Sequence, residues 1–76
     1  PFNPSTIITF TLTEKSFVTL KVFDSLGREV ANLYSGEMSP GTYTRQWNAE
    51  GMSGGTYFYR LQTGSHTETK KISLVK

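Results

Sequence analysis

Apolar and polar residues alternate along most of the chain, and this pattern predicts β-strands. In the stretch 17–23, Val18, Leu20 and Val22 share one face, while Thr19 and Lys21 lie on the other. Such alternation is typical of an antiparallel strand with one face on a core and the other in water. The same pattern predicts further strands at 8–12, 42–48, 56–63 and 67–76.

A weaker candidate strand covers residues 28–34, where the alternation is irregular and a short helical turn is the alternative interpretation. Val30 is the best core candidate within it. The stretches 35–41 and 49–55 are rich in glycine and serine, and this composition predicts loops.

The predicted strands follow one another at roughly ten-residue spacing, and no stretch has a convincing helical pattern. Six or seven short strands of this kind indicate an all-β fold, an antiparallel β-sandwich. A seventh strand would have to lie near Pro1 or near Glu37. The 76 residues suffice for one domain, 1–76. Because the chain begins abruptly at Pro1 without an initiator methionine, we expect it to be a piece of a larger secreted protein.

Composition excludes several classes of function. The chain has no cysteine, so neither a disulfide nor a thiolate metal site is expected, and the redox compartment stays open. The formal net charge of +2 is too small for a nucleic-acid-binding domain, which needs a dense stripe of lysine and arginine. The chain lacks any run of about 18 apolar residues, so we expect no membrane-spanning helix.

The best-defined turn is Asp24-Ser25-Leu26-Gly27-Arg28. The Asp24 side chain can bond to backbone two residues further on, and Gly27 can adopt the positive φ that closes a turn with a bulge. Arg28 then lies within reach of Asp24. The stretch is either a recognition loop or simply a well-formed hairpin.

Two similar stretches, 39–43 and 54–57, each place a glycine turn before a tyrosine. Tyr57 is a candidate for the tyrosine corner of immunoglobulin-like sandwiches, in which the hydroxyl bonds to nearby backbone. Trp47, Tyr57 and Tyr59 are expected to fill the core, although exposed aromatics in a row would instead form a sugar-stacking platform. Phe58 lies on the opposite face, where it packs outside the core or contacts another domain.

Residues suited to catalysis are scattered. His66 has only Glu68 near it in sequence, and a general acid or base would need a nucleophile or carboxylate beside it. The acidic residues occur singly, which gives no pattern for a calcium site or a catalytic carboxylate pair. We therefore expect no enzymatic activity, no metal and no cofactor.

The final stretch, 67–76, predicts a strand with a basic fringe. Ile72 and Leu74 fall on one face, and Lys71, Ser73 and Val75 fall on the other. A strand at a sheet edge offers unpaired backbone N–H and C=O groups to which another protein can bind. Lysines at such an edge limit unwanted pairing.

Four stretches occur in a characteristic order along the chain: 1–6 (PFNPST), 24–28 (DSLGR), 54–61 (GGTYFYRL) and 70–76 (KKISLVK). Together they resemble the type A C-terminal sorting domain of the type IX, or Por, secretion system. The chain begins just inside the lead-in usual for that family, so the cleavage region is expected to be missing. The chain also resembles the immunoglobulin-like module of flagellar hook-capping proteins.

The resemblance implies an immunoglobulin-like β-sandwich at the C-terminus of an exported cargo protein. It implies passage through the periplasm, an outer-membrane translocon as partner, and frequent removal of the domain by a sortase-like peptidase. The cargo would then be secreted or held at the cell surface. The recognition residues implied in the last strand are Lys70, Lys71, Ile72, Leu74, Val75 and Lys76, with Asp24, Gly27 and Arg28 as a second patch.

Three hypotheses of function follow. The leading one is a non-catalytic signal domain that directs an upstream cargo domain to type IX secretion through its terminal strand. The second is a structural spacer or packing domain for an upstream enzyme, which predicts a broad apolar patch around Phe17 and Phe58. The third is a carbohydrate-binding module, which needs coplanar exposed aromatics.

Overall fold

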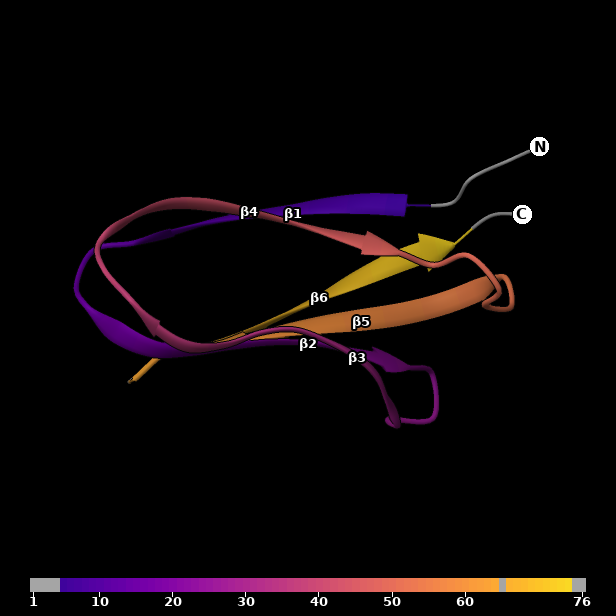
Figure 1. Cartoon of the computed structure of the whole chain (residues 1–76). Helices are drawn as coiled ribbons and strands as arrows, with labels where there is room; N and C mark the ends of the chain where they lie inside the picture. Colours follow the sequence, from indigo (N-terminus) through magenta and orange to yellow (C-terminus); the bar gives the residue numbers. More distant parts are fainter. Residues whose placement is uncertain (1–4, 65, 75–76) are drawn as a thin grey trace.

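The computed structural model describes residues 5–64 and 66–74, and all the regular structure within them is β-strand. The strands lie in two stacked sheets (Figure 1). Their bounds are β1 (Ser5–Leu12), β2 (Ser16–Asp24), β3 (Glu29–Met38), β4 (Gly41–Asn48), β5 (Gly55–Gln62) and β6 (Thr67–Leu74).

The two sheets are unequal in width. The larger has four strands in the order β3-β2-β5-β6, and the smaller pairs β1 with β4. All pairings are antiparallel. The predicted all-β antiparallel sandwich is confirmed with six strands in the described residues. Within the described residues, no helix is long and apolar enough to cross a membrane.

The core forms where the alternating apolar residues of both sheets meet. Val18, Leu20 and Val22 of β2 are fully buried at 0% exposure, as their shared face predicted. Ile8, Phe10 and Leu12 of β1 pack onto Val18 and Leu20 from the small sheet in one cluster, which also holds Met38 and Leu61. A second cluster joins Val22, Trp47, Ala49 and Tyr57.

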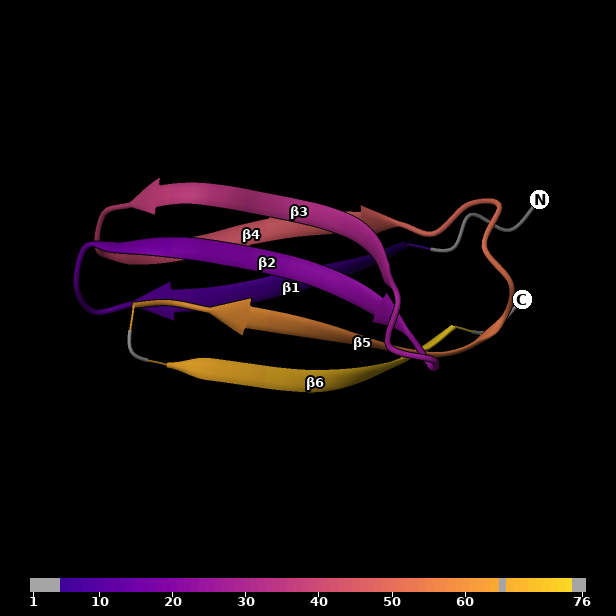
Figure 2. The ribbon, with the colours of Figure 1, turned by 90° about the horizontal axis from the view of Figure 1, so that it is seen from below.

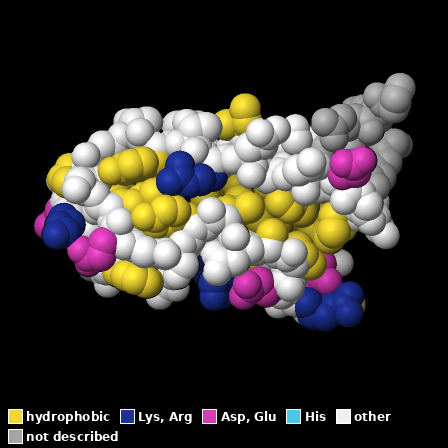
Figure 3. Space-filling view, in the orientation of Figure 1, with side chains coloured by type: hydrophobic (Ala, Val, Ile, Leu, Met, Phe, Trp, Pro, Cys, Tyr) yellow, Lys and Arg dark blue, Asp and Glu magenta, His cyan; other side chains and the backbone are white. Residues whose placement is uncertain are grey.

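The aromatic residues predicted to fill the core do so. Trp47 and Tyr57 are buried, with ring centroids 5.3 Å apart in an edge-to-face arrangement. Tyr59 is half-buried and packs against both clusters. Apolar side chains also show as a band along the gap between the sheets (Figure 3), so the sandwich is not fully closed on the face seen there.

The predicted loop at 35–41 is confined to Ser39 and Pro40, because β3 continues to Met38 and β4 begins at Gly41. The pairing of β3 with β2 skips Val30 and Leu33, which makes each of them a β-bulge. The two extra residues break the period of two, and this explains why the alternation of 28–34 looked irregular. Val30 and Leu33 are half-buried against the core, while Met38, at the end of the strand, is buried.

The two glycine–tyrosine stretches share one hydrogen-bonding pattern. The Tyr57 hydroxyl donates to the Ser53 carbonyl at 2.7 Å, and the Tyr43 hydroxyl donates to the Ser39 carbonyl at 2.6 Å. Gly41 and Gly55, at the starts of the two strands, have φ values of 153° and 143°. Each tyrosine therefore fixes the loop that leads into its own strand, as the tyrosine-corner prediction required for Tyr57.

We predict that Tyr57→Phe lowers the free energy of unfolding by about 0.5–1.5 kcal/mol, the usual net value of a hydrogen bond within a protein. Tyr43→Phe should cost less, because its bond is exposed and water can replace the lost donor. Urea denaturation of both variants and the wild type checks this. An equal or larger loss for Tyr43→Phe would contradict it.

Candidate recognition surface

The last described strand, β6, lies at an edge of the large sheet. It pairs with β5 along its full length, from Gln62 opposite Thr67 to Gly55 opposite Leu74. In the described part of the chain no other strand pairs with it. Figure 2 shows β6 at the outer side of the sheet, beyond β5. Its second edge is thus open, and a row of backbone donors and acceptors is available there.

The two lysines of β6 point to opposite faces of the large sheet. Lys70 lies opposite Tyr59 on the inner face and pairs with Glu68, with 3.7 Å between Nζ and Oε2. Lys71 lies opposite Phe58 on the outer face. Ile72 and Leu74 share the inner face with Lys70 and pack half-buried against the core. The apolar residues therefore hold the strand in place, while both lysines remain exposed.

The outer face beside Lys71 carries a pair of phenylalanines. Phe23 of β2 lies directly opposite Phe58 of β5, and Phe58 in turn lies opposite Lys71. The Arg60 guanidinium stacks over the Phe23 ring, 4.5 Å from its centroid. A cation over an aromatic face at this distance is an attractive contact, worth about 0.5–1 kcal/mol at an exposed site. Lys71 thus borders an aromatic and cationic surface.

The Asp24–Arg28 turn is tied together by one carboxylate. Asp24 Oδ1 accepts hydrogen bonds from the backbone amides of Leu26 and Arg28, each at 2.9 Å. Asp24 Oδ2 accepts a third from Arg28 Nε, also at 2.9 Å. Gly27 has a φ of 85°, a conformation that favours glycine. The predicted turn geometry and the predicted Asp24–Arg28 pair are both confirmed.

These bonds stabilise the charged form of Asp24. The hydrogen bond from the Arg28 amide is the main cause that lowers the pKa of the Asp24 carboxyl below its ordinary value of 3.8, with further help from the Arg28 side chain and the Leu26 amide. Arg28 itself remains 74% exposed at its side chain. The turn therefore presents a positioned cation at the surface.

The turn and β6 come to the same end of the large sheet but do not touch directly. Asp24 pairs with Tyr57, and Tyr57 pairs with Ile72, so β5 separates them. On the outer face they share a shallow hollow of about 280 Å³, which Asp24, Gly27, Phe58 and Thr69 help to line. Of the residues implied by the family resemblance, Asp24 and Gly27 line this hollow, and β6 contributes Thr69, which is not one of them.

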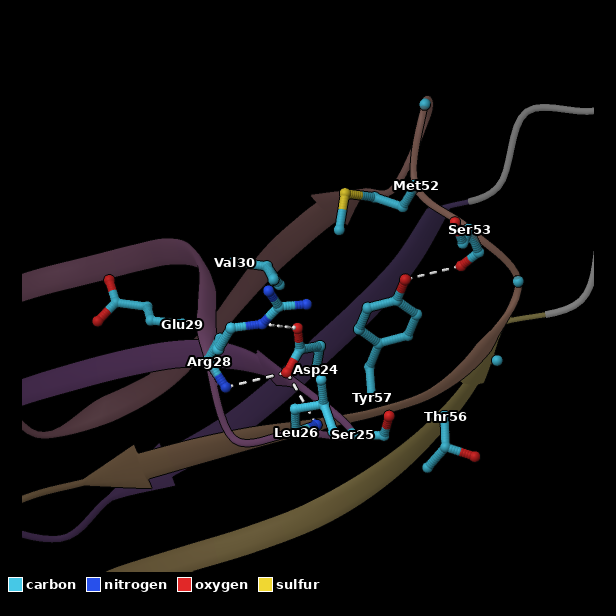
Figure 4. Close-up of a pocket in the computed structure, with 13 residues that line it drawn as sticks. Asp24, Ser25, Leu26, Arg28, Glu29, Val30, Met52, Ser53, Thr56 and Tyr57 are labelled. Carbon is cyan, nitrogen blue, oxygen red and sulfur yellow. Dashed lines mark hydrogen bonds and ion pairs between the residues drawn. The ribbon is translucent and has the colours of Figure 1, made fainter.

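A larger hollow of about 590 Å³ lies at the end of the sandwich, between the Asp24–Arg28 turn and the β4–β5 loop. Figure 4 shows Arg28 and Asp24 on one side of it, with Met52, Ser53 and Tyr57 on the other. The Tyr57 hydroxyl donates to the Ser53 carbonyl, and the Asp24 carboxylate accepts hydrogen bonds within the turn. Both groups are therefore engaged in structural contacts, while the Arg28 side chain stays largely exposed.

Two residues implied by the resemblance, Val75 and Lys76, lie outside the described residues. Sequence reasoning did not assign Phe23 and Arg60 to the surface beside Lys71. The alternation in 17–23 sets Phe23 on the face opposite Val22, as that in 56–63 sets Phe58 opposite Tyr57 and Tyr59, so a usable signal was present in the sequence. The register between strands, which brings them together, is not visible in the sequence.

We predict that Asp24 contributes stability that is present above about pH 4 and is lost as the pH falls through its lowered folded pKa. The wild type should therefore lose more stability between pH 4 and pH 2 than Asp24→Asn. Asparagine keeps an acceptor for the backbone amides but loses the charge. Urea midpoints measured across this range check the prediction.

The matched control is Glu50→Gln, which removes one carboxylate from the exposed β4–β5 loop. It should follow the wild-type pH dependence. An Asp24→Asn variant with the same acid sensitivity as the wild type would show that the lowered pKa of Asp24 has no part in stability.

Comparison with known proteins gives one family. Residues 1–75 match the family described as the secretion system C-terminal sorting domain. Neither the curated proteins nor the solved structures gave a match. The family is one of sorting signals rather than catalysts, and membership implies export to the cell surface or secretion across the outer membrane. The chain therefore belongs to the C-terminal sorting domain family of type IX secretion.

Proposed function

We propose that the secretion machinery recognises this sorting domain through the open edge of β6 and the adjacent Asp24–Arg28 turn. The observation that carries the proposal is the position of β6, which pairs with β5 alone among the described strands and has exposed lysines on both faces. In this reading the domain acts as a non-catalytic signal for an upstream cargo domain, with an outer-membrane translocon and a sortase-like peptidase as partners.

The open edge supplies affinity through backbone groups. An extended segment of a partner can add to a free strand edge by main-chain hydrogen bonds, and side chains on alternate positions then give specificity. Lys71, which lies beside Phe58 on the outer face of the sheet, would contact such a segment. An acidic side chain in the partner would pair with Lys71, and the neighbouring Arg60 would increase the positive potential.

The Asp24–Arg28 turn supplies a second, rigid contact. Because Asp24 already accepts from the backbone and from Arg28 Nε, the position of the guanidinium is fixed before a partner arrives. A preorganised group loses little conformational entropy on binding. The other N–H donors of Arg28 remain at the surface, where they suit a carboxylate.

A packing domain for an upstream enzyme is the second candidate. Phe17 is 55% exposed on the outer face of β2, in the same sheet as Phe23 and Phe58. These side chains form an apolar surface that an upstream domain would bury. The carbohydrate-binding hypothesis has no comparable support, because Trp47 and Tyr57 are buried in the core.

The test uses a secreted reporter fused to this chain in a host with type IX secretion. We predict that the double variant Lys70→Glu and Lys71→Glu reduces the exported fraction by about tenfold or more, because like charges across an interface cost several kcal/mol. The measurement is the ratio of surface and medium reporter to periplasmic reporter. The matched control, Lys15→Glu, reverses an exposed lysine of the β1–β2 loop and should be exported normally.

Circular dichroism of each purified variant shows whether the sandwich is intact. A folded double variant that is exported like the wild type would refute recognition through β6. Normal export combined with a less stable reporter would instead favour the packing function.

A further inference from the structure

The inner face of β6 extends beyond the small sheet. In Figure 2, β1 lies between β2 and β5 towards its C-terminal end and crosses behind β2 towards its N-terminal end, and β6 lies beyond β5. The small sheet has only β1 and β4 among the described residues, so no strand of it covers β6. Ile72 and Leu74 are accordingly only half-buried. Among the described residues, no strand lies beside β1 on the side away from β4.

A hollow marks the uncovered position. It has a volume of about 290 Å³ and lies between β1 and β6. Phe10 and Thr11 line it from β1, Tyr59 from β5, and Glu68 and Lys70 from β6. Glu68 and Lys70 pair with each other, so the β6 wall of the hollow carries no net charge. Glu14 and His66 line it at the loops, beyond the ends of β1 and β6. A segment laid along the β6 wall therefore needs no charge of its own to match it.

The other edge strands, β3, β4 and β6, carry features that discourage unselective pairing. β3 has bulges at Val30 and Leu33, and β4 has the inward-facing Arg45 over the Tyr34 ring. β6 has the inward-facing charges of Glu68 and Lys70. Bulges and inward-pointing charges are the usual protection of sheet edges.

The edge of β1 has none of these features. Its eight residues, STIITFTL, include no charge, proline or glycine. Its pairing with β4 runs from Ser5 to Leu12 without a register shift. Its outer face and that of β4 are uncharged, with threonines at Thr9, Thr11, Thr42 and Thr44. A regular, uncharged edge of this kind is ready to accept another strand.

We propose that the free edge of β1 accepts one extended segment of a partner protein, which becomes the third strand of the small sheet. Alternate side chains of this segment point inward over β6. Apolar residues fit against Ile72 and Leu74, and small uncharged residues fit over the Glu68–Lys70 pair. This surface is distinct from the outer edge of β6, and it does not depend on the recognition of β6 by the secretion machinery.

A second copy of the chain does not fit this position. If β1 paired with β1 of another copy in one continuous sheet, β6 of each copy would extend beneath β1 of the other, and the two β6 strands would collide. Each β1 is also only about 27 Å long. Pairing two such edges alone buries far less than the roughly 1,200–2,000 Å² of a stable specific complex. A single inserted strand avoids the collision and also covers the inner face of β6.

The test is disulfide trapping, which the absence of native cysteine allows. The probe is an end-blocked peptide of alternating threonine and valine with one central cysteine on the threonine face and a lysine at each end. Three single variants report on three edges: Thr9→Cys on β1, Thr44→Cys on β4 and Thr69→Cys on β6. All three threonines are exposed and on outer faces, and Thr9 and Thr44 are direct cross-strand partners.

We predict that Thr9→Cys couples to the peptide at least about tenfold faster than the other two, because a disulfide requires closely placed Cβ atoms. Amides of residues 5–12 should also gain protection from hydrogen exchange. A control peptide with N-methyl groups on alternate residues of its bonding edge cannot extend a sheet and should couple equally slowly to all three variants.

Three results would overturn the proposal. Preferred coupling at Thr44→Cys or Thr69→Cys would place the accepting edge elsewhere. Equal, slow coupling at all sites with about 1 mM peptide would show that no edge accepts a strand. A Thr9→Cys dimer that forms without peptide, faster than the Thr44→Cys dimer, would identify a second copy as the occupant. Each result is independent of the export of the reporter.

Discussion

The unequal width of the two sheets is the constraint on which the remaining features depend. A two-stranded sheet covers a four-stranded one, and the core that β1 and β4 form with β2, β3 and β5 includes β6 only through Ile72 and Leu74. β6 is consequently held by its hydrogen bonds to β5 and by Ile72 and Leu74 at one end. The strand is anchored well enough to be ordered, yet one of its edges and part of its inner face remain open.

A sorting domain must avoid indiscriminate association while its recognition surface stays accessible to a partner. Bulges in β3 and inward charges in β4 and β6 limit indiscriminate pairing. Pairing between selected partners is still possible, because lysines reject like charges but accept acidic groups. In this account the distribution of charge decides which partner each edge accepts: an acidic segment at β6 and a neutral one at β1.

Local features of this fold were predictable from the sequence. Alternation located five strands. The spacing of Asp24, Gly27 and Arg28 predicted the turn, including the ion pair between Asp24 and Arg28. Each of these depends on residues close together in the chain. The two bulges in β3 were not predictable, because an inserted residue has no signature of its own and Ser35 and Gly36 suggested a loop. The register that places Phe58 between Phe23 and Lys71 depends on strands far apart in sequence.

Hydrogen exchange of the β6 amides, resolved by NMR, tests the central claim most directly. In an antiparallel edge strand, alternate residues bond to the neighbouring strand and the others face water. The account predicts protection at every second amide of residues 67–74 and fast exchange at those between. Uniform protection would mean that another strand covers the edge, and uniform fast exchange would mean that β6 is not held by β5. Either outcome would contradict the account.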